Sequence, residues 1–153
     1  MFYRDAEDEA HMRAALELAR RAAALGEVPV GAVVVREGKI IGEGYNQREL
    51  LHSPLAHGEI LAIEQACRAV GDWRLTGCSL YVTLEPCPMC AGAILNARLR
   101  RLVYGAADLK GGCCGSLMNL MALDFPIRPS VTAGVLAGEC TQVLEDFFQG
   151  LRE

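Results

Sequence analysis

Residues 79–97, SLYVTLEPCPMCAGAILNA, decide how the rest of the chain is interpreted. The first six of them, Ser79–Leu84, alternate weakly between polar and apolar side chains and predict a strand. Residues 88–97 predict a short helix, because a proline in the first turn costs a helix no hydrogen bond. Cys87 and Cys90 therefore stand three residues apart, where a loop enters a helix.

The segments on either side of this stretch also alternate between strand and helix patterns. Before it, we expect a helix at 6–25, a hairpin of strands at 28–36 and 40–46, and a helix at 57–70. After it, we expect a strand at 101–105, a helix at 116–123, a strand at 130–135 and an amphipathic helix at 136–151. In the last helix, four apolar residues are predicted to face inward: Val143, Leu144, Phe147 and Phe148. This order predicts an α/β fold with a mixed sheet, formed by residues 1–153 as a single domain.

The composition is that of a soluble protein with reduced cysteines. Apolar residues make up 52% of the chain, and charged residues interrupt every apolar run before the ~20 residues that a membrane helix needs. The seven cysteines are an odd number, and residues 1–13 are acidic, unlike a secretory signal. We therefore expect a cytoplasmic protein with no membrane partner. Because the net charge is −4, binding to nucleic acid would require a local basic patch.

A second motif, His57-Gly58-Glu59, begins the predicted helix at 57–70 and completes a candidate metal site. Two cysteines three residues apart can direct both thiolates at one metal ion, and His57 can supply a third ligand if its helix lies beside theirs. Three protein ligands leave one tetrahedral position of Zn²⁺ open for water, which is typical of catalytic sites. Zinc lowers the pKa of water from ~15.7 toward ~7, and Glu59 can move the protons. The pattern predicts one catalytic Zn²⁺ per chain.

Spacing alone leaves two other interpretations of the cysteine pair open. A Cys-x-x-Cys pair can be a redox site, although such a pair usually follows the start of a thioredoxin-like βαβ unit, and this one follows several earlier elements. The pair can also be half of a structural zinc site whose fourth ligand is His11, His52, Cys113, Cys114 or another cysteine. A structural site has no use for Glu59, so the His-x-Glu motif favours catalysis. Cys67 and Cys140 lie in helical patterns and are expected to pack in the core. Cys113 and Cys114 lie in a glycine-rich loop, where packing is favoured over a second reactive pair.

Together these motifs resemble the cytidine-deaminase-like superfamily and, within it, the bacterial tRNA-specific adenosine deaminases. The resemblance covers nearly the whole chain and rests mainly on EVPVGAV (27–33), GEGYN (42–46), AHGEI (56–60) and YVTLEPCPMCAGA (81–93). Two later stretches, GGCCGSLMNL (111–120) and DFF (146–148), are also similar to this group. At one position the chain departs from the pattern, because the family usually has alanine where this chain has Gly58. Both residues are small, so we expect activity to be retained.

The resemblance implies a three-layer α/β/α sandwich with a five-stranded mixed sheet, a homodimer, and conversion of adenosine to inosine at the wobble position of a tRNA anticodon. It assigns His57, Cys87 and Cys90 to zinc and Glu59 to proton transfer. Substrate contacts would come from four residues: Asn46, Pro86, Asp108 and Lys110. Asn46 matches a residue that hydrogen-bonds the base, and Asp108 matches a loop aspartate that can bind the 2′-hydroxyl of RNA. Spacing alone would make Asn46 a turn residue and Asp108 an exposed loop residue.

The sequence offers one candidate for the local basic patch that nucleic-acid binding would require. Four basic residues near the second metal motif are candidates for the patch: Arg98, Arg100, Arg101 and Lys110.

A deaminase of a free nucleobase or nucleotide (guanine, cytosine or deoxycytidylate) would share the metal motifs, and the acidic net charge favours it weakly. The Phe147–Phe148 pair and residues 116–118 favour the tRNA enzyme instead. A non-catalytic zinc module for RNA binding would not need Glu59.

Overall fold

The computed structural model, which describes the backbone of residues 2–152 and the side chains of residues 5–152, places a five-stranded sheet between two layers of helices. The elements in chain order are α1 (Phe2–Ala24), β1 (Gly31–Arg36), β2 (Lys39–Tyr45), α2 (Gly58–Val70), β3 (Ser79–Leu84), α3 (Pro88–Asn96), β4 (Arg101–Ala106), the 3-10 turn η1 (Leu120–Ala122), β5 (Ser130–Ala133) and α4 (Ala137–Arg152). No helix among the described residues is long and apolar enough to cross a bilayer.

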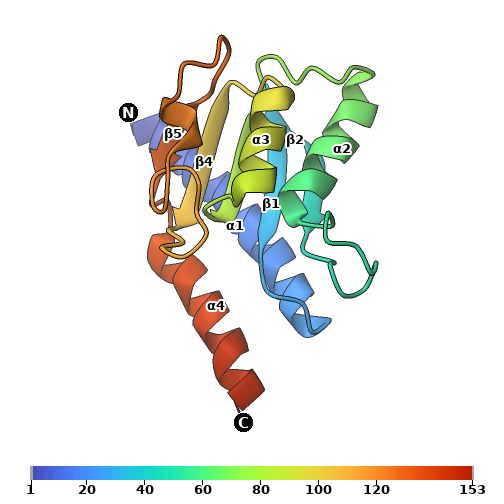
Figure 1. Cartoon of the computed structure of the whole chain (residues 1–153), viewed down its shortest axis with the longest axis vertical. Helices are drawn as coiled ribbons and strands as arrows, with labels where there is room; N and C mark the ends of the chain where they lie inside the picture. Colours follow the sequence, from blue (N-terminus) through green and yellow to red (C-terminus); the bar gives the residue numbers. More distant parts are fainter. Residues whose placement is uncertain (1, 153) are drawn as a thin grey trace.

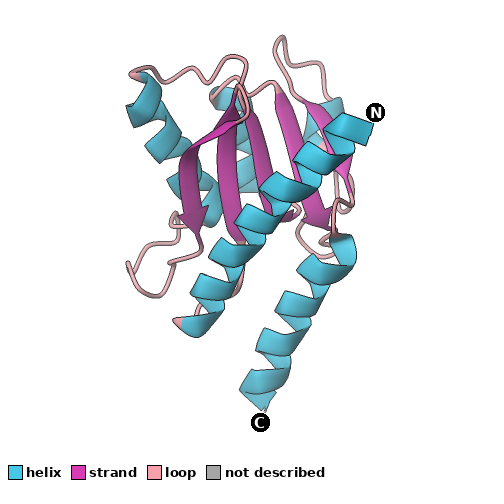
Figure 2. Ribbon diagram, turned by 180° about the vertical axis from the view of Figure 1, so that it is seen from behind, coloured by secondary structure: helices cyan, strands magenta, loops and turns pink. Residues whose placement is uncertain are grey.

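The sheet is mixed, with strand order β2-β1-β3-β4-β5. Strand β1 is antiparallel to both β2 and β3, whereas β3, β4 and β5 are parallel to one another. Helices α2 and α3 cover one face of the sheet (Figure 1), and α1 and α4 lie on the other (Figure 2). This arrangement confirms the expected three-layer α/β/α sandwich with a five-stranded mixed sheet.

Successive side chains of the central strands enter two separate cores. In β1, Ala32 and Val34 pack in the core beneath α2 and α3, while Val33 and Val35 pack in the core beneath α1. This follows from the two-residue period of a strand, which points successive side chains to opposite faces. Because both faces of β1, β3 and β4 are covered, these strands are apolar almost throughout and show only weak alternation in the sequence.

Two glycines let α2 lie directly on β2, and this contact positions the start of α2. A Cβ at Gly44 would lie 2.7 Å from the backbone nitrogen of Ala62, and one at Gly42 would lie 2.9 Å from the Cβ of Ala66. Side chains are therefore excluded at both positions. At Gly58, where the family usually has alanine, a Cβ would lie 3.1 Å from the Gly44 carbonyl oxygen, so an alanine would require its neighbours to move by a few tenths of an ångström.

Three local predictions differ from the structure. The strand predicted at 28–36 begins later, at Gly31, so residues 28–30 precede it. The predicted helix at 116–123 is wrong: only η1 forms, because the Leu120 N–H bonds the Cys113 carbonyl at 2.8 Å instead of the Ser116 carbonyl that a regular helical ladder would require. The inward orientation of Phe148 is also wrong, because α4 extends beyond the sheet and leaves this side chain 42% exposed.

The other predictions of burial are mostly confirmed. The side chains of Val143, Leu144 and Phe147 are half-buried. Cys113, Cys114 and Cys140 are buried as expected, whereas Cys67 is only half-buried.

A buried ion pair joins α1 to the sheet and corrects the expectation for Arg101. Its guanidinium binds both carboxylate oxygens of Asp8, at 2.6 and 2.7 Å, and the Tyr81 hydroxyl donates to the same carboxylate at 2.8 Å. Arg101 is 6% exposed and Asp8 4% exposed. Arg101 is therefore part of the core and contributes nothing to a basic surface.

Replacing Arg101 with methionine should lower the free energy of unfolding by about 3–5 kcal/mol, because the buried Asp8 carboxylate would lose the guanidinium that binds both of its oxygens. Chemical denaturation measures the loss. The control is Arg13→Ala, which breaks an ion pair with Glu139 whose side chains are 56% and 46% exposed and should cost less than about 1 kcal/mol. Equal losses in the two variants would show that the buried pair has no special structural role.

Candidate metal centre and substrate pocket

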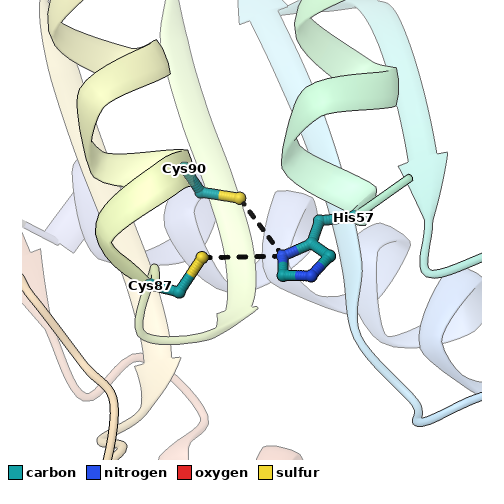
Figure 3. Close-up of side chains that lie close together, drawn as sticks. All are labelled: His57, Cys87 and Cys90. Atoms are coloured by element: carbon teal, nitrogen blue, oxygen red, sulfur yellow. Dashed lines mark hydrogen bonds between the residues drawn. The ribbon is translucent and has the colours of Figure 1, made fainter. Parts of the chain in front are cut away.

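The three predicted metal ligands meet where two helices begin side by side. His57 is the N-cap of α2 and Cys87 the N-cap of α3, and Pro88 follows in the first turn of α3. The Nδ1 atom of His57 lies 3.6 Å from Cys87 Sγ and 3.5 Å from Cys90 Sγ, as Figure 3 shows. The sequence motifs thus converge on one point, although 30 residues separate His57 from Cys87.

The donor atoms have the separation that a tetrahedral zinc ion requires. Zinc–nitrogen bonds of ~2.0–2.1 Å and zinc–sulfur bonds of ~2.3 Å place nitrogen and sulfur about 3.6 Å apart in a tetrahedron. All three donor atoms lie within 4.8 Å of one another, and no other histidine, cysteine, aspartate or glutamate among the described residues joins the group. The fourth protein ligand that a closed structural site needs is therefore absent from this part of the chain. Two sulfurs and one imidazole nitrogen fit Zn²⁺ well.

Local interactions favour the thiolate at Cys87. A hydrogen bond from the Cys90 thiol, reinforced by His57, lowers the pKa of Cys87 to about 4, and the same sharing of a proton raises the pKa of Cys90. The hydrogen bond to Cys87 also raises the pKa of His57. The positive end of the α3 dipole acts in the same direction on Cys87, because it favours negative charge at the helix N-terminus. A thiolate is the form of cysteine that binds metals.

Glu59 lies in the first turn of α2 and lines the same pocket as His57 and Cys87. Its side chain is 4% exposed, and burial raises the pKa of its carboxyl group. Glu59 does not join the group of metal donors. A buried carboxyl group beside a metal centre, but outside its ligand set, is suited to accept and donate protons.

The pocket over this centre has a volume of about 160 Å³. Its lining includes the apolar residues Val28, Val30 and Leu84 and the polar residues Asn46, Arg48 and Asp108. Asn46 is 7% exposed; its amide nitrogen donates to the Val28 carbonyl at 3.2 Å, and its side-chain oxygen accepts from the Arg48 N–H at 3.1 Å. Asn46 thus shapes the turn, and it still has one N–H and one lone pair for a ligand.

The other three predicted substrate residues lie in different surroundings. Asp108 lines the pocket and accepts the N–H groups of Lys110 and Gly111, at 3.1 and 3.2 Å. Lys110 is exposed and lines a neighbouring apolar groove with Leu109 and Phe148. Pro86 is buried, and its carbonyl accepts the Cys113 N–H at 2.8 Å. Among the described residues, the lining of the metal pocket includes neither Pro86 nor Lys110.

Among the described residues, three of the four candidates for the basic patch lie away from the metal ligands or are buried. Arg98 and Arg100 follow the carboxyl end of α3, whereas the metal ligands lie at its amino end. Arg101 is buried against Asp8. The positive charge at the pocket is instead Arg48, which sequence reasoning missed.

Sequence reasoning also missed two buried carboxylates that hold the loops around the pocket. Glu27 is 1% exposed and accepts the N–H groups of Glu49 and Leu50, at 3.1 and 2.7 Å. Glu85 is 2% exposed; burial raises its pKa, but hydrogen bonds from the loop after β4, led by Ser116, outweigh burial and leave the pKa below its usual value. The sequence feature that could have identified both residues is a glutamate next to an apolar run. A glutamate in such a place is rarely buried unless other groups bind its carboxylate.

Comparisons with known proteins match this chain to deaminases. Residues 6–152 match the model of the MafB19-like deaminase family. The tRNA-specific adenosine deaminase of Bacillus subtilis is 49% identical over 148 residues, which cover 96% of this chain and 92% of that protein. A structure from a study of A-to-I editing by tRNA:A34 deaminases at the wobble position superposes with a TM-score of 0.85 at 44% identity, covering 88% of this chain and 99% of that one.

A guanine deaminase from Nitrosomonas europaea has the same fold at lower identity. It superposes with a TM-score of 0.81 at 28% identity, covering 91% of this chain and 83% of its own. The resemblance seen in the sequence is confirmed by these matches. The chain belongs to the MafB19-like deaminase family and, within the cytidine-deaminase-like fold, to the group of the tRNA-specific adenosine deaminases.

Proposed function

We propose that this chain catalyses the zinc-dependent hydrolytic deamination of adenosine to inosine at the wobble position of a tRNA anticodon. One observation carries the chemistry: three metal donors lie together, and the buried Glu59 lines one pocket with two of them, His57 and Cys87. The substrate is inferred from the relatives at 49% and 44% identity, which are named for tRNA deamination. The guanine deaminase, at 28% identity, supports the free-base alternative less strongly.

The side chains of the pocket divide the work between binding and proton transfer. His57, Cys87 and Cys90 would hold Zn²⁺. Zinc bound there supplies a Lewis acid that lowers the pKa of water toward ~7, so that a nucleophile is available at neutral pH. Glu59 takes a proton from the attacking water and delivers it to the base, so that water and adenosine become inosine and ammonia. The remaining N–H and lone pair of Asn46 can orient the base.

A comparison of three substrates tests this function. The purified protein is incubated with an anticodon stem-loop carrying adenine at the wobble position, with free adenosine and with free guanine, and the release of ammonia is measured. We expect release from the stem-loop to be the fastest. Activity on guanine alone would establish the free-base alternative, and no release from any substrate, with zinc bound, would favour a non-catalytic zinc module.

Asp108 should contribute to the choice of RNA over DNA. A carboxylate at the pocket can accept a hydrogen bond from a ribose 2′-hydroxyl, and DNA offers no such donor to offset the repulsion of its phosphates. We expect Asp108→Asn to reduce the ratio of RNA to DNA deamination rates, mainly by improving the rate on DNA. Rates on a stem-loop and its DNA copy measure the ratio. An unchanged ratio would remove Asp108 from the substrate site.

The remaining expectations concern the state of the protein in the cell. We propose a cytoplasmic homodimer in which residues 1–153 form a single domain. A cluster of apolar residues between η1 and β5 is exposed and available for a second copy: Leu123, Phe125 and Ile127 are 51%, 41% and 49% exposed. Sedimentation of the purified protein measures its mass, and a monomer at micromolar concentration would contradict the homodimer.

A further inference from the structure

We propose that Glu85 is a positioning residue for the substrate: it holds the loop of residues 108–116 at the pocket and so places Asp108. The proposal rests on the proposed function, in which Asp108 meets the ribose. It concerns a side chain that lies between β3 and the metal ligand Cys87 and also lines the pocket.

Among the described residues, this one loop supplies the hydrogen bonds to the Glu85 side chain. Its Oε1 atom accepts the Asp108 N–H at 3.1 Å and the Ser116 hydroxyl at 2.5 Å. Its Oε2 atom accepts the N–H groups of Cys114 and Ser116, both at 3.0 Å. Both ends of the loop are thus attached to a single carboxylate that is 2% exposed.

The loop encloses this carboxylate closely. A Cβ at Gly112 would overlap the Glu85 carboxylate and would lie 2.6 Å from the Asp108 carbonyl oxygen, so a side chain is excluded there. Asp108 in turn accepts the N–H groups of Lys110 and Gly111, which forms the turn that begins the loop. The Asp108 carbonyl also accepts the Gly112 N–H at 2.8 Å, but that bond lies within the loop, whereas the bond from the Asp108 N–H to Glu85 ties the start of the loop to the end of β3.

Glutamine at position 85 would remove that bond selectively. If its amide oxygen takes the place of Oε2, it keeps the bonds from Cys114 and Ser116, and its NH₂ group meets the Ser116 hydroxyl, which can accept. The NH₂ group then also faces the Asp108 N–H, which cannot accept. The opposite orientation would set the NH₂ group against two N–H groups and is disfavoured. Glu85→Gln should therefore release Asp108 while the rest of the loop stays attached.

The expected phenotype differs from that of a general structural defect. Glu85→Gln should keep one zinc per chain. It should raise the KM for the RNA stem-loop about tenfold, which is the effect of losing the hydrogen bond between the ribose 2′-hydroxyl and the charged Asp108 carboxylate, with a smaller change in kcat. The ratio of RNA to DNA rates should fall, as expected for Asp108→Asn. In the double variant the effects should not add, because both changes disturb the same contact.

The matched control is Glu27→Gln, a change at the other buried carboxylate that accepts backbone N–H groups from a pocket loop. Its effect should add to that of Asp108→Asn. Additive effects of Glu85→Gln and Asp108→Asn would overturn the proposal, and so would loss of zinc from Glu85→Gln.

Hydrogen exchange of the free protein tests the positioning without any substrate. Glu85→Gln should speed exchange at residues 108–111 and leave α3 unchanged, whereas unchanged exchange at residues 108–111 would overturn the proposal. If wild type fails to deaminate the stem-loop, the proposed function fails, but the exchange result still decides whether Glu85 holds the loop.

Discussion

Glu59→Gln should retain zinc and the native fold but deaminate an anticodon stem-loop at least ~10²-fold more slowly than wild type. Glutamine has the shape of glutamate, and Glu59 does not join the three metal donors, so the metal centre should persist. The amide cannot accept the proton that a carboxylate takes from water. Since Glu59 lines the pocket and is 4% exposed, bulk water cannot readily replace it as the proton carrier.

Ammonia release under saturating substrate gives the rate, and elemental analysis gives the zinc content of the same samples. The control is Glu64→Gln on the solvent side of α2, which should match wild type in both measurements. A Glu59→Gln enzyme that turns over near the wild-type rate would show that another group moves the proton. Loss of zinc from this variant would mean that Glu59 supports the metal centre rather than the chemistry.

The candidate metal centre, in which His57, Cys87 and Cys90 meet, was predictable from sequence because each half of it is local. Cys87 and Cys90 share one turn of chain, and His57 and Glu59 share another, so the covalent spacing already limits where their side chains can reach. Only the proximity of the two turns depends on the fold. The alternation of strands and helices in the sequence predicted that fold. The N-caps of two helices on the same face of a sheet lie side by side when the helices run in the same direction, as α2 and α3 do (Figure 1).

The surroundings of the metal centre were less predictable because they depend on contacts between distant segments. Arg98 and Arg100 are near Cys90 in sequence, but α3 carries them away from the metal by about 13 Å over nine residues. Arg101 binds Asp8, 93 residues earlier, and no local pattern marks that pair. The helix predicted at 116–123 failed for a similar reason, since the Leu120 N–H bonds the Cys113 carbonyl, outside the predicted segment, instead of the Ser116 carbonyl.

The second large effect should come from the metal ligands themselves. Cys87→Ala and Cys90→Ala should each lose both zinc and deaminase activity, because two donors cannot hold Zn²⁺ as three do and the lost thiolate also neutralised part of its charge. His57 Nδ1 lies 3.6 and 3.5 Å from the two sulfurs, so each alanine substitution removes one of three donor atoms that lie close together. Zinc per chain and ammonia release are measured on proteins purified without added metal.

Cys67→Ala is the matched control, because Cys67 is a half-buried cysteine of α2 that stands outside the donor group. It should keep zinc and activity, which separates the loss of a ligand from the general effect of removing a thiol. Full zinc occupancy in both Cys87→Ala and Cys90→Ala would mean that the ligands are wrongly assigned. If only one of the two variants keeps zinc and has no activity, the thiolate removed in that variant acts in the reaction and is not a metal ligand. The zinc ion would then need another residue as its third ligand.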